Sequence, residues 1–154
     1  MTKKRVRYSE GDVFAVPVTG GYAICIVTRR AGPLGYFFGP VRAKLPELDE
    51  LNFKEDTPVL IGKFGVLGMT SGEWPKLGSL PGWNREDWPV PLFVETDYVS
   101  EKRYAVQYAE EDLATPLRFL SLPEEQLDRL PEAGLHGHGL IESLLSDLLS
   151  ESRR

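Results

Sequence analysis

The stretch "RYSEGDVFAVPVTGGYAICIVTRR", residues 7–30, holds two apolar runs joined by Thr19-Gly20-Gly21. Both runs, residues 12–18 and 22–28, are apolar at alternate positions and at most of the positions between them. Strands with this pattern are usually covered on both faces, as in a barrel or a sheet flanked by helices. The two glycines supply the positive φ angles that a tight turn requires. The stretch therefore predicts a buried β-hairpin that serves as scaffold.

The rest of the chain adds strands and short helices to this hairpin. Apolar runs bounded by glycine and proline predict further strands, and leucines spaced three or four apart predict helices. The expected strands are residues 34–41, 58–67, 92–94, 103–108 and 117–120, and the expected helices are residues 42–51, 121–130 and 140–150. We predict an α+β, β-rich fold. A strongly bent antiparallel sheet or a partly open barrel carries a few short helices and a C-terminal amphipathic helix.

The expected domain organisation follows from the composition of residues 131–154, the last part of the chain. Residues 1–130 are expected to form a single β-rich domain, and "PEAGLHGHG", residues 131–139, a flexible connector. Residues 140–154 then form an amphipathic helix with two adjacent rows of apolar side chains. A helix of this kind does not stay alone in water. It folds back on its own domain, or it joins a second copy or a partner, and the sequence leaves both alternatives open.

Composition limits the classes of partner. The chain has 154 residues and a formal net charge of −5, which disfavours non-specific binding to nucleic acid or to an anionic membrane surface. No apolar run reaches the roughly 20 residues that span a bilayer, so we expect no membrane association. Cys25 is the single cysteine. An intramolecular disulfide is therefore excluded, and a cytoplasmic location is expected.

A search for catalytic patterns finds none. The chain has no glycine-rich phosphate loop and no serine in a nucleophile-elbow context. His136 and His138 form an H-x-H pair, but third and fourth ligands at a recognisable spacing are missing. Cys25 lies within an apolar strand, where a cysteine usually acts as a small inert hydrophobe. We assign no catalytic residues, no metal ligands and no cofactor, and expect that the protein is not an enzyme.

Two features suit recognition of another protein. Trp83 and Trp88 lie in a loop rich in proline, and tryptophan is enriched at binding hot spots. Glu110, Glu111 and Asp112 form an acidic run, which attracts a basic partner. These five residues are the candidate binding residues. Buried tryptophans and a solvated acidic face are the structural alternatives.

A different class of function stays open as the alternative. A small enzyme or ligand-binding domain would use a pocket lined by Trp74, Tyr104, Tyr108 and a carboxylate, for which Glu73 is the candidate. Glu73 adjoins Trp74, which favours this hypothesis. Trp74 lies next to the apolar part of the chain, however, and is the tryptophan best suited to a buried core.

The order of these segments resembles the immunity protein 26 family of bacterial polymorphic toxin systems. Members begin with a G-D-x-F-A-x-P-L-like strand, a glycine turn and a YAxGRV-like strand, and later carry a G-x-W-x-x-I-G-like segment. The resemblance covers roughly residues 7–120. Ile24-Cys25-Ile26 replaces the usual glycine and arginine of the second strand. The matching positions are Gly11, Asp12, Phe14, Ala15, Pro17, Tyr22 and Ala23, then Gly72, Trp74 and Gly78, with Leu77 in the apolar place.

The resemblance implies a non-enzymatic protein that binds and neutralises a cognate toxin made by the same cell. Many toxins of such systems act on nucleic acids and are basic, so a basic nuclease is the toxin class that an acidic inhibitor would suit. The small size, the acidic charge and the lack of a catalytic pattern agree with this function. Self-association through the C-terminal helix remains a further hypothesis.

Overall fold

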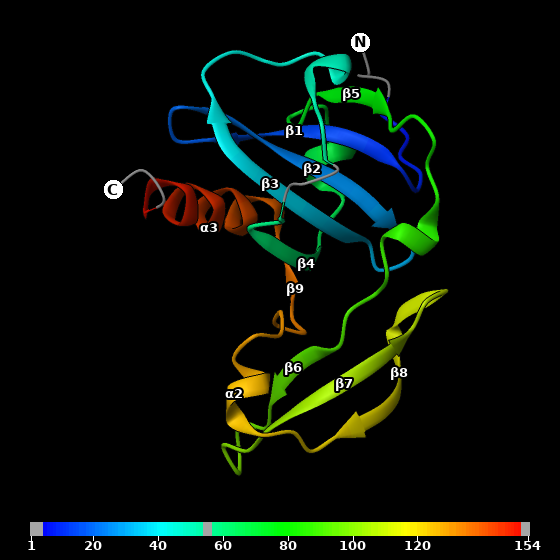
Figure 1. Ribbon diagram of the computed structural model, residues 1–154, viewed down its shortest axis with the longest axis vertical. Coiled ribbons are helices and arrows are strands. Elements are labelled where there is room, and N and C mark those ends of the chain that lie inside the picture. Colours follow the sequence, from blue (N-terminus) through cyan, green and yellow to red (C-terminus); the bar gives the residue numbers. More distant parts are fainter. Residues whose placement is uncertain (1–4, 54–56, 152–154) are drawn as a thin grey trace.

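The computed structural model describes residues 5–53 and 57–151. These residues form two sheets, one above the other in Figure 1, with a long helix beside the larger one. The strands are β1 Asp12–Val18, β2 Gly21–Arg29, β3 Leu34–Arg42, β4 Leu60–Phe64, β5 Lys76–Ser79, β6 Phe93–Thr96, β7 Arg103–Ala109, β8 Asp112–Leu120 and β9 Leu135–His136. The α-helices are α1 Leu67–Thr70, α2 Glu124–Leu127 and α3 His138–Glu151, and the 3₁₀ turns are η1 Leu48–Glu50 and η2 Arg85–Asp87.

The larger sheet is built around the predicted hairpin. Its strand order is β5-β1-β2-β3-β4-β9, and β1 pairs with β2 in the register Ala15↔Ile24. Gly20 and Gly21 have φ angles of 91° and 151°, as the turn prediction requires. The two-residue strand β9 adds a parallel edge to β4, while the other pairings are antiparallel. The sheet bends without closing into a barrel, so the predicted fold class is confirmed.

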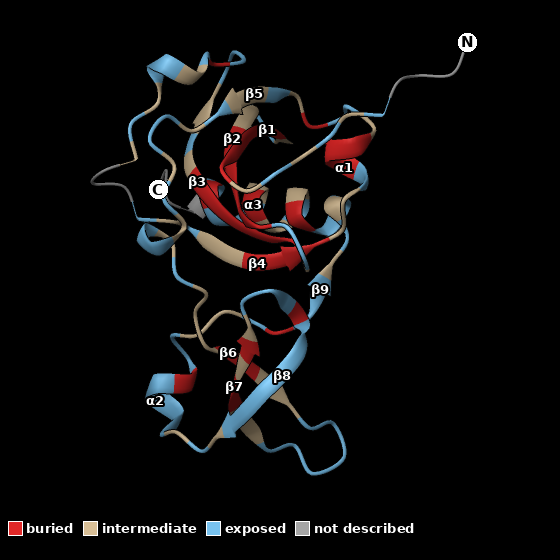
Figure 2. Ribbon diagram, turned by 90° about the vertical axis from the view of Figure 1, so that its right-hand side faces the viewer, coloured by how far each residue is buried: buried red, intermediate tan, exposed pale blue. Residues whose placement is uncertain are grey.

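Both faces of this sheet are covered, which explains why its strands are apolar at successive positions. On one face, Phe14, Cys25 and Phe37 pack against α3 and Trp74, and we call this cluster the first core. On the other face, the strands pack against the smaller sheet and the loops that precede it. Figure 2 shows the central strands of this sheet as buried. The residues that represent this second core are Val13, Ile24, Ile26, Leu34, Phe38, Phe93, Val106 and Leu113.

The smaller sheet, β6-β7-β8, lies below the larger one in Figure 1 and is covered on one side by α2. Lys63 of β4 joins the two sheets. Its Nζ donates to the Leu113 carbonyl at 3.2 Å and lies 4.0 Å from the centroid of the Tyr108 ring. Burial lowers the pKa of Lys63, while the charge of Glu95 opposes that shift. The lysine therefore ties the sheets together through one hydrogen bond and through cation–π contacts with the Tyr108 and Phe93 rings.

The C-terminal helix α3 folds back on the larger sheet. Ile141, Leu145 and Leu149 are buried against it, whereas Leu140 and Leu148 of the neighbouring row stay exposed. The helix begins at His138, and the segment expected to be a flexible connector contains β9. Residues 152–154 of the predicted helix lie outside the described residues. Self-association through the exposed row of α3 stays a prediction.

Several expected elements differ from the structure. The strand expected over 117–120 is the end of a longer strand, β8, which begins at Asp112. In the helix expected over 42–51, Arg42 instead ends β3, and the only helical turn is η1. Leu48 and Leu51 pack on the second core without a helix, and Leu45 remains exposed. The expected strand 58–67 ends at Phe64, and α1 follows. The helix expected over 121–130 is limited to α2, whose N-cap is Pro123 with no side-chain hydrogen bond. Local apolar spacing does not decide these lengths when tertiary packing supplies the contacts.

No helix among the described residues combines the length and the apolar character needed to cross a membrane.

Candidate functional site

The loop that carries Trp83 and Trp88 is anchored on the second core. Gly11 has a φ of +87°, and a Cβ added to it would lie 2.8 Å from Cγ of Trp83, so glycine is needed for this close approach. The Trp83 and Trp88 rings stack with centroids 6.2 Å apart. Trp88 also meets the Tyr36 ring edge-on at 5.3 Å. Both tryptophans are half-buried, so each is fixed by packing while part of the residue remains accessible to solvent.

The turn η2 projects from this loop toward the β7–β8 turn. Asn84 begins η2, and its side chain accepts a hydrogen bond from the Glu86 amide at 3.1 Å. Nη1 of Arg85 donates to Oε1 of Glu111 at 2.7 Å, and its Nη2 donates to Oε2 of Glu10 at 3.3 Å. The hydrogen bond between Arg85 and Glu111 raises the pKa of the arginine and lowers that of the glutamate. Arg85 thus brings the tryptophan loop and the acidic run together.

A second arginine lies beneath the first. The side chain of Arg29 is 2% exposed, and its Nη2 donates to Oε1 of Glu110 at 3.0 Å. Its Nη1 donates to the Thr28 carbonyl at 2.6 Å. Glu110 is half-exposed, so the buried guanidinium has its carboxylate partner at the surface. This contact fixes the end of β7 against the end of β2.

Asp112 fixes the start of β8. Its carboxylate accepts hydrogen bonds from the Ala114 amide at 3.0 Å and from the Thr115 hydroxyl at 2.8 Å. These bonds, first the one from Ala114, lower the pKa of Asp112. The three predicted acidic residues therefore have structural partners as well as exposed surface. They are neither free charges nor buried ones.

We call this region the acidic surface. It is formed by Glu10, Trp83, Arg85, Glu86, Asp87, Trp88, Glu110, Glu111 and Asp112. This surface has six carboxylates and three nearby arginines. Arg85 belongs to the surface, Arg29 lies beneath it, and Arg30 flanks it over the Tyr8 ring. The surplus of negative charge attracts a cationic partner. The two aromatic rings add apolar contact area between the charges.

The residues of the alternative pocket do not line one cavity. Trp74 is fully buried in the first core, stacked on Phe64 with centroids 5.4 Å apart. Tyr108 belongs to the second core, on the opposite face of the larger sheet. Tyr104 lies on the smaller sheet against Phe119. Glu73 is exposed and lies 3.1 Å from Nε2 of His138.

Sequence reasoning missed the three residues that join the acidic surface, which are Glu10, Arg29 and Arg85. Arg29 and Glu110 are separated by 81 positions in the chain, so no local pattern connects them. The one available signal was Arg29 itself, a charged residue directly after a long apolar run. In residues 5–53 and 57–151, no three histidine, cysteine, aspartate or glutamate side chains gather as metal ligands.

The motif residues of the first hairpin position this surface instead of forming it. Asp12 is buried, accepts a hydrogen bond from the Ser79 hydroxyl at 2.8 Å and pairs with Lys76 at 3.1 Å. It therefore holds β5 against β1, while the adjacent Gly11 receives Trp83.

Comparison with known proteins gives one match. Residues 9–105, from the entry into β1 to the middle of β7, match the sequence model of the immunity protein 26 family. No curated protein and no solved structure matches the chain.

Proposed function

The chain belongs to the immunity protein 26 family, and on this premise we propose that it binds and neutralises a cognate protein toxin through the acidic surface. The family suggests a toxin-neutralising function, and immunity proteins are generally not enzymes. The placement of the binding face rests on one observation. The side chain of Arg85 joins the tryptophan loop to Glu111, so both predicted sets of binding residues share one surface.

The charge of this surface supports a basic toxin. Six carboxylates lie among three arginines, and opposite charge on a partner speeds association and fixes its orientation. A toxin that acts on nucleic acid needs a basic face to bind phosphates. An inhibitor that covers such a face with carboxylates would block access of the substrate. A basic nuclease is therefore the toxin class that the proposal favours.

The tryptophans support tight contact. Trp88 is held between Tyr36 and Phe38, with ring centroids 5.3 and 6.0 Å away, and Trp83 stacks on Trp88. A ring fixed before binding loses little conformational freedom when a partner covers it. We expect Trp83→Ala to weaken toxin binding by about 2 kcal/mol or more. Trp88→Ala should weaken it at least as much, because Trp88 also supports Trp83.

Calorimetric titration with the toxin domain encoded beside this chain tests the proposal. The expected result is a one-to-one complex with a nanomolar dissociation constant and an association rate that falls as salt is added. No heat of binding at micromolar concentrations would contradict the proposed function.

A matched pair of charge reversals tests the binding face. Glu86 lies in the acidic surface and Glu125 lies on α2, and both are exposed. Each Glu→Lys change alters the net charge by the same amount. Glu86→Lys should slow association much more than Glu125→Lys. Equal slowing by the two variants would mean that overall charge matters and that the acidic surface is not the binding face.

A further inference from the structure

The outer edge of β8 is the one long strand edge of the smaller sheet that the described residues leave open. The opposite edge, along β6, is covered, since the Val94 amide donates to the Pro131 carbonyl at 2.8 Å and the Ala133 amide donates to the Val94 carbonyl at 2.9 Å. On β8, the Leu113 amide donates to the Ala31 carbonyl at 3.1 Å. Between there and Leu120, no other backbone group of the described residues pairs with this outer edge. An open edge presents backbone donors and acceptors that fit another strand.

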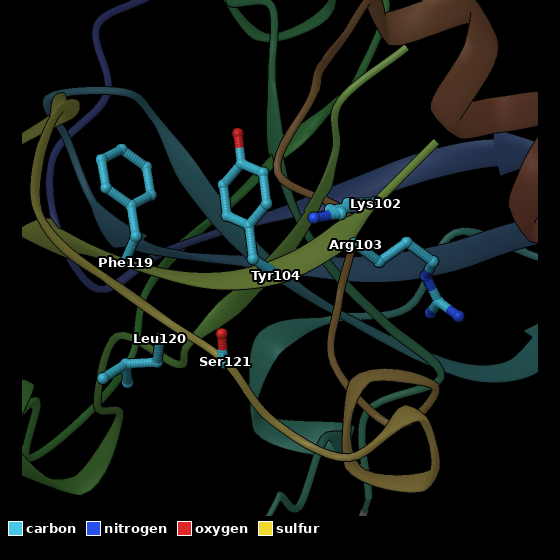
Figure 3. Close-up of a pocket in the computed structure, with 6 residues that line it drawn as sticks. All are labelled: Lys102, Arg103, Tyr104, Phe119, Leu120 and Ser121. Carbon is cyan, nitrogen blue, oxygen red and sulfur yellow. The ribbon is translucent and has the colours of Figure 1, made fainter. Parts of the chain in front are cut away.

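Leu117 and Phe119 of β8 expose large apolar side chains on either side of the charged Arg118. Leu117 is 60% exposed and Phe119 is 58% exposed. Of the ten large apolar side chains that are exposed in the described part of the chain, four lie in the smaller sheet and its hairpin: Tyr98, Val99, Leu117 and Phe119. In Figure 3, the Phe119 and Tyr104 rings stand on the same side of the sheet, and their centroids are 5.4 Å apart. Clustered exposed apolar side chains mark interaction sites.

A shallow pocket lies at the end of this edge. It has a volume of about 390 Å³ and is lined by residues 102–104 and 119–121 (Figure 3). Arg103, on its wall, is held by Glu124 at 2.7 Å and Asp128 at 2.8 Å, so its position is fixed by α2. Tyr104, Phe119 and Leu120 supply the apolar side chains of its lining. The pocket has room for a side chain of a segment that runs along β8.

The edge is continuous with the acidic surface, because β8 starts at Asp112 and follows directly on Glu110 and Glu111. A segment bound along β8 would therefore have carboxylates at one end and apolar side chains at the other. Pro116 has no amide hydrogen, and the pairing of β7 with β8 shifts register beside it, so we expect backbone pairing with a further strand within Leu117–Leu120. The family match ends at residue 105, before β8, so this edge is a feature of the part of the chain that the family model does not describe.

We propose that the outer edge of β8 binds an extended strand of the toxin by strand addition. The strand carries apolar side chains over Leu117 and Phe119 and a lysine or arginine facing Glu111 and Asp112. This proposal rests on the proposed function and adds a second contact to the acidic surface. A second copy of this chain suits the edge less well, because it brings a like net charge of −5 and a second Pro116.

Calorimetric titration with the toxin domain encoded beside this chain tests the outer edge of β8 through matched variants. Leu117→Ser and Leu67→Ser remove leucines of nearly equal exposure, 60% and 58%, and Leu67 belongs to α1 on the larger sheet. Leu117→Ser combined with Phe119→Ser should raise the dissociation constant about tenfold or more, while Leu67→Ser leaves it unchanged. Equal affinity of the β8 variant and wild type would overturn the proposal but leave the proposed function intact. Failure of wild type to bind would overturn both.

Hydrogen exchange of the unmodified chain gives a readout that does not depend on variant folding. Strand addition requires that amides within 117–120 exchange more slowly in the complex than in the free chain. Unchanged exchange there would show that no strand pairs with β8. A free chain that sediments as a dimer, and as a monomer after the Leu117 and Phe119 changes, would assign the edge to a second copy and contradict the proposal.

Discussion

The two sheets of this protein differ in what covers them. The six-stranded sheet is buried on both faces, by α3 on one side and by the smaller sheet with its loops on the other. In the three-stranded sheet, β8 is exposed over most of its length (Figure 2). A strand covered on both faces accepts few changes, because each side chain touches a packed core. The exposed strand is free to carry residues chosen for binding.

If the proposed binding faces are correct, this difference assigns stability and recognition to different regions of one small chain. The motif residues that resemble the family, such as Gly11, Asp12 and Trp74, all act in the scaffold. The residues proposed to touch a partner lie in loops and on the edge strand supported by that scaffold. We therefore expect changes in the two regions to separate into effects on unfolding and effects on binding.

The largest effect on stability is expected for Trp74→Ala. Trp74 is fully buried and stacks on Phe64, so its removal leaves a large cavity in the first core. The free energy of unfolding should fall by about 3–5 kcal/mol. Leu117→Ala on the exposed strand should change it by less than about 1 kcal/mol. Guanidinium unfolding curves measure both, and similar losses for the two variants would remove the distinction between the sheets.

A smaller loss of unfolding free energy is expected for a change at the turn between β1 and β2. Gly21 has a φ of +151°, and a Cβ at this position would collide with the Arg42 carbonyl. Gly21→Ala should therefore cost roughly 2 kcal/mol of unfolding free energy. Gly134→Ala is the control, because an added Cβ meets no atom within 4 Å there. Thermal unfolding that shows the same loss for both variants would contradict the role assigned to the turn.

The two glutamates of the β7–β8 turn give a sharper comparison. Glu110 partners the buried Arg29, whereas Glu111 is 82% exposed and partners the more accessible Arg85. Glu110→Gln leaves a buried guanidinium without its carboxylate and should cost about 1–2 kcal/mol, reduced by the partial exposure of Glu110. Glu111→Gln should leave the unfolding midpoint almost unchanged. If Glu111→Gln lowered the denaturation midpoint more than Glu110→Gln, Arg29 would not depend on its carboxylate partner more than Arg85 does.

The smallest effect concerns pH. The pKa of Asp112 is lowered in the folded chain by the hydrogen bonds from Ala114 and Thr115. A carboxyl with a lowered folded pKa stabilises the fold above its unfolded pKa, and this contribution is lost as pH falls through the folded value. The midpoint difference between wild type and Asp112→Asn should therefore be largest at neutral pH and shrink below about pH 4. A difference that grows with acidification would contradict this sign.

The sequence predicted the scaffold better than the surface. The hairpin follows from local apolar periodicity and Gly20-Gly21, and both lie within one short stretch. The helix expected over residues 42–51 was wrong, because Leu48 and Leu51 find their apolar contacts on the second core from an irregular loop. β9 has two residues, too few for any pattern, and its strand form depends on pairing with β4.

Only some members of the candidate site could be predicted from the sequence, and their assembly could not. Trp83, Trp88 and the acidic run stand out by residue type, but Arg85 lies 26 positions from Glu111 and 75 from Glu10. Such contacts are created by the tertiary fold. The exposed apolar residues of β8 were unpredictable for a related reason. Alternation within a strand shows which residues share a face, but whether another segment covers that face depends on the whole chain.

Hydrogen exchange of the chain, free and bound to the toxin domain encoded beside it, tests the central claim most directly. The account predicts slower exchange on binding in the loop 83–88 and along residues 110–120, with little change in the already protected strands β1 to β3. Slower exchange confined to α3 or to the loop 44–51 would contradict it. The toxin would then bind a face other than the acidic surface and the β8 edge.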